Sequence, residues 1–191
     1  MKFLIISGNP KSDGLCAKIT SEVERGARDG GAEVEIIIPR GLDNCHVCGD
    51  GWGECRKTRR CVYGTDGFNE LRGLVENADA LCFVSPVYCA ETSELMKCFT
   101  DRLRRCLAPF PFMGEAGKGL AGKQTLLVVS AGGSGNGLIT ALEQLDRFCQ
   151  HTAAPVFDRI MQNRWNADYV QQAAYSAAKA IAEGRKLGDN L

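Results

Sequence analysis

The chain has 191 residues, which is enough for one well-buried domain and too few for two of ordinary size. Lysine plus arginine and aspartate plus glutamate each total 23, so no excess of positive charge points to nucleic acid or to an anionic membrane surface. No stretch approaches the roughly 20 apolar residues of a membrane helix. We expect a single domain over residues 1–191 whose partner is a small molecule or another protein, with no nucleic acid and no membrane.

The chain contains ten cysteines. Its apolar start, residues 3–6, stops at Ser7 and is too short for the core of a secretory signal peptide. Without export the cysteines lie in a reducing compartment, where clustered thiols are typical of metal ligands or redox groups rather than of disulfides. We therefore expect a cytoplasmic protein.

Short apolar runs alternate with longer amphipathic ones along the chain, the pattern of β-α-β units and a parallel sheet. This alternation predicts strands at residues 3–6, 33–38, 80–84, 125–129 and 155–157. The first, third and fourth are continuously apolar, as central strands buried on both faces must be. The second alternates charged and apolar residues and the fifth is short and contains Pro155, so both fit the edges of the sheet better.

Helices are predicted between these strands, at about 14–30, 66–77, 93–106, 137–151 and 166–187. Strict alternation of strands and helices predicts a doubly wound α/β sandwich with right-handed crossovers.

The third predicted helix carries several residues of interest. Lys97 and Asp101 are four residues apart and are expected to form an ion pair. The position of Arg102 leaves open a contact with a nicotinamide nucleotide or with a partner subunit. Cys98 here and Cys82 in the third strand have apolar neighbours, and both are predicted to lie in the core.

A polar loop, residues 7–16, follows the first strand at the place where an open α/β sheet binds phosphate. Backbone N–H groups and the dipole of the following helix favour an anion there, and Ser7, Lys11 and Ser12 can donate directly. The loop is neither a Walker A motif nor G-x-G-x-x-G, which argues against ATP or a dinucleotide bound in the usual way. The alternative is an ordinary turn between strand and helix.

Two more polar loops follow the third and fourth strands, at residues 85–92 and 130–137. Ligands in this architecture bind outside the carboxyl ends of the strands, so the three loops are expected to converge on one crevice. Pro86 and Tyr88 offer a rigid turn and an aromatic wall suited to a flat ring, unless Tyr88 only packs on the sheet.

Residues 41–65 are an irregular insert after the second strand, and they contain Cys45, Cys48, Cys55 and Cys61. Spacing of two, six and five residues lets one loop wrap four sulfurs around a single centre. A cubane iron–sulfur cluster, a tetrahedral zinc ion and free thiols that cycle through disulfides all remain open.

The segment Arg56–Arg60, between the last two of these cysteines, carries four cations. They either lower the pKa of nearby thiols, or form a solvated face or a docking patch for an acidic carrier.

Three segments resemble the flavodoxin-like NAD(P)H-dependent FMN reductase family: S-G-N-P-K-S-D-G at 7–14, S-P-V-Y at 85–88, and E-L-M-K followed by D-R at 94–102. The cysteine loop resembles the iron–sulfur flavoprotein branch, although that branch usually separates its second and third cysteines by two residues rather than six. The resemblance implies a flavodoxin-like five-stranded parallel sheet of order 2-1-3-4-5 and a homodimer or homotetramer. It also implies FMN, NAD(P)H as a substrate, and a [4Fe-4S] cluster on the four cysteines.

The resemblance further implies that the 7–16 loop holds the FMN phosphate and that the other two loops flank the isoalloxazine. The implied cofactor-binding residues are Ser7, Asn9, Lys11, Ser12, Gly14, Leu15, Cys16, Ser85, Pro86, Val87, Tyr88, Cys89, Ala131, Gly132 and Gly133. No side chain need act as nucleophile or general acid, because the cofactor carries the chemistry.

These sequence features are consistent with three different functions. The first is an oxidoreductase that couples two-electron flavin chemistry to a one-electron cluster, exchanging electrons with a small molecule or a protein such as a ferredoxin-like carrier. The second is a plain NAD(P)H-dependent flavin, quinone or metal reductase whose cysteine site holds zinc or is vacant. The third is a noncatalytic redox sensor or electron shuttle.

Overall fold

The computed structural model describes residues 1–48, 53–109 and 119–186. Its sheet has six strands: β1 Lys2–Ser7, β2 Glu33–Ile37, β3 Ala80–Tyr88, β4 Glu91–Thr92, β5 Gln124–Ser130 and β6 Val156–Gln162. Five of them form a parallel path in the order β2-β1-β3-β5-β6, and the two-residue β4 pairs antiparallel with the end of β3. The predicted order of the parallel strands is confirmed.

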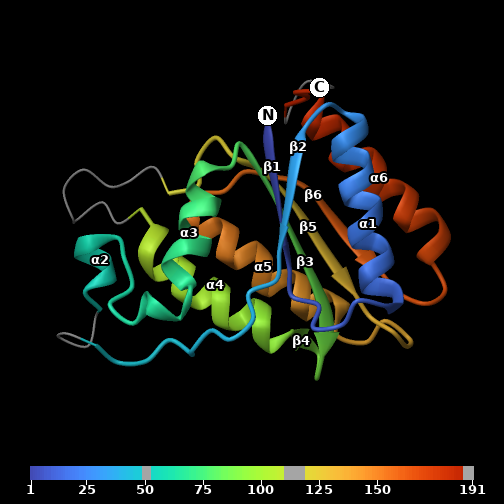
Figure 1. Ribbon diagram of the computed structural model, residues 1–191. Helices are drawn as coiled ribbons and strands as arrows, with labels where there is room; N and C mark the ends of the chain where they lie inside the picture. Colours follow the sequence, from blue (N-terminus) through green and yellow to red (C-terminus); the bar gives the residue numbers. More distant parts are fainter. Residues whose placement is uncertain (49–52, 110–118, 187–191) are drawn as a thin grey trace.

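Helices cover both faces of this sheet (Figure 1). They are α1 Gly14–Asp29, α2 Cys55–Thr58, the 3-10 helix η1 Gly64–Asp66, α3 Phe68–Asn77, α4 Glu94–Leu107, α5 Leu138–Thr152 and α6 Ala167–Ala182. Helices α1 and α6 lie on one face, and α3, α4 and α5 lie on the other. The doubly wound α/β sandwich is therefore confirmed. Within the described ranges, no helix is long and apolar enough to cross a bilayer.

The central strand β1 shows how the sequence builds two cores. Successive side chains of a strand point to opposite faces of its sheet. Phe3 and Ile5 accordingly pack with α1 and α6, while Leu4 and Ile6 pack with α3, α4 and α5. All four side chains are at most 2% exposed, so this strand is buried on both faces, as its unbroken apolar run predicts.

The last strand is longer than predicted. The expected strand at 155–157 stops before Asp158 and Arg159, but β6 continues through both to Gln162. These polar side chains are tolerated because β6 is an edge strand, and they are exposed there while Ile160 and Gln162 are buried. The short α2, η1 and β4 were not predicted either, since two to four residues carry no periodic signal.

Helix α4 confirms one prediction from the sequence and contradicts another. The ion pair between Lys97 and Asp101 is confirmed. Cys98 is not in the core: it is half-buried, and its thiol donates to the carbonyl of Asp43 at 3.0 Å. The prediction was wrong because a loop passes over this face of the helix instead of a packed helix. Cys82 is fully buried, as predicted.

Helices α1 and α6 approach closely at Gly26, where a Cβ atom would lie 2.1 Å from the Tyr175 carbonyl oxygen. We expect Gly26→Ala to lower the free energy of unfolding by about 1–3 kcal/mol, because the backbones must separate. Gly73→Ala in α3 is the matched control, since a Cβ there meets nothing within 4 Å. The control should raise stability by about 0.5–1 kcal/mol. Urea denaturation measures the free energy of unfolding of both variants. If both substitutions changed it in the same direction, the close contact at Gly26 would be contradicted.

Candidate functional site

A hollow of about 520 Å³ lies at the carboxyl ends of the strands. It sits where the strand order reverses between β1 and β3, the usual ligand position in open α/β sheets. Nine of the predicted cofactor-binding residues line it: Asn9, Lys11, Gly14, Leu15, Cys16, Pro86, Val87, Tyr88 and Gly132. Asp13, Ser130 and Arg164 complete the lining. The three predicted loops therefore do converge on one crevice.

Asn9 is the residue of this hollow with an unmet hydrogen bond. The side chain is 4% exposed, and its Oδ1 accepts the backbone N–H of Lys11 at 3.2 Å. Its Nδ2 is buried and has no hydrogen-bond partner. Leaving a buried donor unpaired costs about 1–3 kcal/mol, so the arrangement fits a ligand that supplies an acceptor.

The start of α1 adds backbone donors to the same place. Its N-cap residue, Asp13, makes no side-chain capping hydrogen bond. The N–H groups of a first helical turn point out of the helix and carry partial positive charge, which favours an anion. Together with the Asn9 amide, they give the hollow the chemistry that a phosphate group needs.

The turn after β3 is strained. Cys89 and Ala90 have φ values of 49° and 64°, in the left-handed region that non-glycine residues rarely adopt. The β3–β4 pairing and a hydrogen bond from the Thr140 hydroxyl to the Ala90 carbonyl hold the turn in place. Strain of this kind is typical of ligand-binding positions, and here it lies directly after Tyr88 on the hollow.

The other six predicted cofactor residues do not line the hollow: Ser7, Ser12, Ser85, Cys89, Ala131 and Gly133. Ser12, Cys89 and Gly133 are exposed, and Ala131 belongs to the core. The hydroxyl of Ser7 accepts the Asn9 backbone N–H at 3.3 Å, so it shapes the loop from inside.

Ser85 is fully buried and supports the site from below. Its hydroxyl accepts the Ser93 backbone N–H at 3.0 Å, and the Ser93 hydroxyl donates to the Gly8 carbonyl at 2.7 Å. This chain of hydrogen bonds connects β3, the start of α4 and the first loop.

Gln162 is a supporting residue that the sequence did not reveal. It is fully buried at the end of β6, and its amide donates to the Leu15 carbonyl at 3.0 Å and to the Ser130 hydroxyl at 2.8 Å. Leu15 and Ser130 both line the hollow. The predicted strand ended five residues too early, so neither Gln162 nor the nearby Arg164 was placed at a strand end.

A second hollow, of about 170 Å³, lies in the cysteine loop. It is lined by Cys45, His46, Val47, Cys48, Gly53, Cys55 and Arg105. A Cβ atom on Gly53, whose φ is 89°, would lie 3.0 Å from the Cys55 sulfur and 3.7 Å from the Cys48 sulfur. Three of the four predicted cysteines thus line one hollow. Residues 49–52 of the insert lie outside the described ranges.

The thiols of this loop have shifted pKa values. A hydrogen bond with the Cys106 thiol outweighs burial, and with help from Arg105 it lowers the pKa of Cys55. Burial is the main cause that raises the pKa of Cys45, and Arg105 opposes it. The cation that acts on both thiols is therefore Arg105 of α4. Within the Arg56–Arg60 segment, Arg59 donates to the Cys106 and Ala108 carbonyls.

The donor chemistry of this loop suits a thiolate-bound metal, but its sulfurs are not gathered into a ligand set. Among the described residues, no three histidine, cysteine, aspartate or glutamate side chains form a group that could hold a metal ion. All ten cysteines are free thiols.

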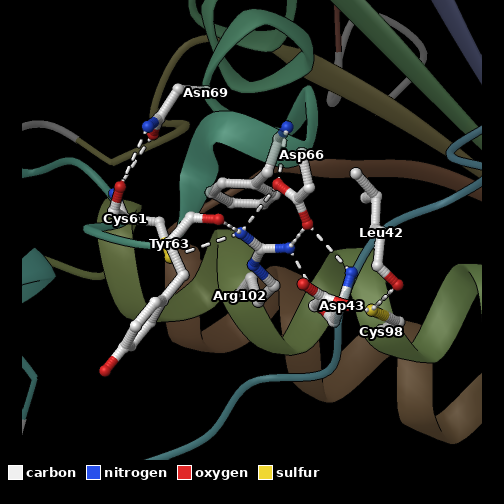
Figure 2. Close-up of polar contacts among 9 residues, drawn as sticks. Leu42, Asp43, Cys61, Tyr63, Asp66, Asn69, Cys98 and Arg102 are labelled. Atoms are coloured by element: carbon white, nitrogen blue, oxygen red, sulfur yellow. Dashed lines mark hydrogen bonds and ion pairs between the residues drawn. The ribbon is translucent and has the colours of Figure 1, made fainter. Parts of the chain in front are cut away.

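Cys61, the last of the four, is held by a buried arginine (Figure 2). Arg102 is 2% exposed and forms a bidentate ion pair with Asp66, at 2.5 and 3.1 Å. It also donates to the Cys61 sulfur at 3.3 Å. We call these interactions the Arg102–Asp66 clamp.

The clamp fixes both ends of the cysteine insert. Arg102 donates to the carbonyls of Asp43, before the first cysteine, and of Tyr63, after the last. Its guanidinium lies 4.2 Å from the centroid of the Phe68 ring. Arg102 therefore has a structural role here, because its buried guanidinium is engaged by Asp66, Cys61 and two backbone carbonyls of its own chain.

The NADPH-dependent FMN reductase family matches this sequence over residues 1–166. The chain belongs to this family. The predicted family is thereby confirmed, and with it the expectation of an oxidoreductase family.

Curated relatives carry the name iron–sulfur flavoprotein. One from Archaeoglobus fulgidus is 33% identical over 105 residues, which are 54% of this chain and 46% of the relative. One from Methanocaldococcus jannaschii is 27% identical over 151 residues, 78% of this chain and 71% of the relative. The matched region thus spans about half the length of the Archaeoglobus protein.

Solved structures confirm the flavodoxin-like fold. A flavone reductase superposes with a TM-score of 0.68 at 20% identity, covering 97% of this chain and 63% of that one. An archaeal flavodoxin superposes with a TM-score of 0.63 at 14% identity, covering 98% of this chain and all of the flavodoxin. An NADH:FMN oxidoreductase in its apo form gives 0.62 at 18% identity, covering 99% and 92%.

The clamp makes a pH-dependent contribution to stability. Burial raises the pKa of Asp66, but hydrogen bonds from Arg102 and from the backbone of Asp43 and Phe68 outweigh it and lower the pKa to about 2. Because the folded-state pKa lies below the unfolded value of 3.8, the contribution is complete above about pH 4 and is lost as the pH falls through about 2.

We expect Asp66→Asn to lower the free energy of unfolding at pH 7 by about 3–5 kcal/mol, because it leaves the buried guanidinium without a counter-charge. Asp101→Asn, which breaks the exposed pair on the same helix, is the control and should cost less than about 1 kcal/mol. Urea denaturation between pH 2 and 7 should also show that acidification lowers the free energy of unfolding of wild type by about 2 kcal/mol more than that of Asp66→Asn. Parallel pH profiles would contradict the role of the clamp.

Proposed function

We propose that the protein is an FMN-dependent oxidoreductase that uses NAD(P)H as its reductant. The observation that carries the proposal is the buried, unpartnered Nδ2 of Asn9, in a hollow at the carboxyl ends of the strands. Membership of the NADPH-dependent FMN reductase family supports FMN as the ligand. A bound FMN supplies hydride and electron transfer, so the protein needs no nucleophile or general acid.

The residues of the hollow divide into two groups by chemistry. Asn9, Lys11 and the N–H groups at the start of α1 bind the phosphate. Pro86, Val87 and Tyr88 form a rigid, largely apolar wall that orients the ring and excludes water on that side. Burial raises the pKa of Cys16 to about 12, so this thiol stays protonated and serves only as an apolar lining.

We further propose that the cysteine loop holds an iron–sulfur cluster that exchanges single electrons, the finer form of this function. Cys45, Cys48, Cys55 and Cys61 would supply the thiolates, and the names of the curated relatives support iron over zinc. The lowered pKa of Cys55 favours the thiolate that a metal requires, and Arg105 on the same hollow offsets negative charge there.

The surroundings of the reaction remain predictions. We propose a cytoplasmic location, supported by ten free thiols in one chain. The electron acceptor is a small molecule or a protein carrier, and a homodimer or homotetramer is the expected assembly.

The phosphate site can be tested with Asn9→Asp, which keeps the acceptor for the Lys11 N–H but replaces the unpartnered donor by a carboxylate. We expect FMN to bind the apoprotein variant at least about 10-fold more weakly, because phosphate then meets a negative charge. Riboflavin, which lacks phosphate, is the matched control ligand and should lose less than about 3-fold. Flavin fluorescence titration measures both. Unchanged FMN affinity would show that Asn9 does not face the phosphate.

The cluster is tested by anaerobic purification followed by iron and acid-labile sulfide analysis. We expect stoichiometric iron and sulfide in wild type and a loss of most of both in Cys48→Ser, because one ligand is gone. Cys89→Ser, an exposed thiol outside the loop, is the control and should keep them. Zinc in place of iron, or equal iron in all three proteins, would refute the cluster and leave a plain flavin reductase.

A further inference from the structure

Arg164 lines the proposed FMN hollow on the side formed by the loops after β5 and β6. Neither spacing nor a motif in the sequence indicated this residue. Its Nε donates to the Gly132 carbonyl at 3.2 Å. This hydrogen bond ties the guanidinium to the loop after β5 and leaves its two terminal NH₂ groups for other partners. Both Arg164 and Gly132 line the hollow.

The charges around Arg164 are unbalanced. In the described part of the chain, neither Arg164 nor Lys11 forms an ion pair, and Asp13 is the one acidic residue of the lining. The Arg164 guanidinium lies 5.5 Å from the centroid of the Trp165 ring, a contact that helps to hold it. An anchored guanidinium without a counter-ion, on a hollow with one excess cation, suits an anionic ligand.

A second observation points to the same ligand. Asn9, which lines the same hollow, is more than nine-tenths buried, and its Nδ2 has no hydrogen-bond partner. Donors therefore reach this space from the first loop and from the segment after β6. An arginine fork matches the oxygens of a phosphate group, which accept two parallel hydrogen bonds.

We propose that Arg164 binds a phosphate group of the ligand in this hollow. The inference rests on the FMN site proposed above. The phosphate monoester of FMN and the phosphates of a reduced nicotinamide nucleotide offer the fork the same chemistry, so the experiment has an arm for each source.

The variants are Arg164→Ala, Arg164→Lys and the control Arg159→Ala. Arg159 is an exposed arginine on β6, five residues before Arg164. It forms an ion pair with Asp146 and does not line the hollow. Apoproteins are titrated with FMN and with riboflavin by flavin fluorescence. Reconstituted proteins are assayed at saturating FMN for kcat and for the KM of NADPH, and thermal melting compares their folding.

If the phosphate belongs to FMN, Arg164→Ala weakens FMN binding by about 10- to 100-fold and leaves riboflavin within about 3-fold of wild type. If it belongs to the nucleotide, FMN affinity is kept, the KM for NADPH rises about 10-fold or more, and kcat is kept. Arg164→Lys keeps the positive charge but lacks the planar guanidinium, so its affinity or KM lies between those of wild type and Arg164→Ala. Arg159→Ala behaves as wild type.

The inference is overturned if Arg164→Ala keeps both FMN affinity and KM. It is also overturned if FMN and riboflavin lose affinity equally, because phosphate is then not what Arg164 recognises. Failure of the wild-type apoprotein to bind FMN is a separate result, and it refutes the proposed FMN site itself.

Discussion

The buried ion pair between Arg102 and Asp66 is the constraint on which the cysteine loop depends. The loop has little core of its own: of its four cysteines only Cys55 is buried. A guanidinium that is 2% exposed must have its hydrogen bonds met, and Asp66, Cys61 and two backbone carbonyls meet them. Since those carbonyls belong to Asp43 and Tyr63, satisfying one charge fixes both ends of the insert against α4 (Figure 2).

The hollow at the carboxyl ends of the strands rests on a different kind of support. Ser85, Ser93 and Gln162 are fully buried and hydrogen-bonded beneath it, so its floor is rigid. In contrast, Asn9 in its lining has an unpaired donor, and the Cys89–Ala90 turn that follows Tyr88 is strained. A preformed binding site needs hydrogen-bonded groups beneath it and unpaired groups in its lining. The ligand then completes the hydrogen bonds that folding left unmade.

The sequence predicted those features that local pattern determines. Unbroken apolar runs located β1, β3 and β5, and the polar loops after them located the hollow. What it missed depends on contacts between distant residues. Gln162 matters because it reaches Leu15, which is 147 positions away, and Arg102 is buried because of Asp66, 36 positions away. Cys98 was misplaced for the same reason, since its apolar neighbours do not show that the segment around Asp43 crosses its helix face.

The central claim is that the hollow at the carboxyl ends of the strands binds FMN through its phosphate. A crystal structure of the protein grown with FMN tests it most directly. We expect the phosphate within hydrogen-bonding distance of Asn9 Nδ2 and of the N–H groups at the start of α1, with the ring beside Pro86–Tyr88. A flavin bound elsewhere, or an Asn9 amide paired within the protein while the phosphate lies away from it, would contradict the account.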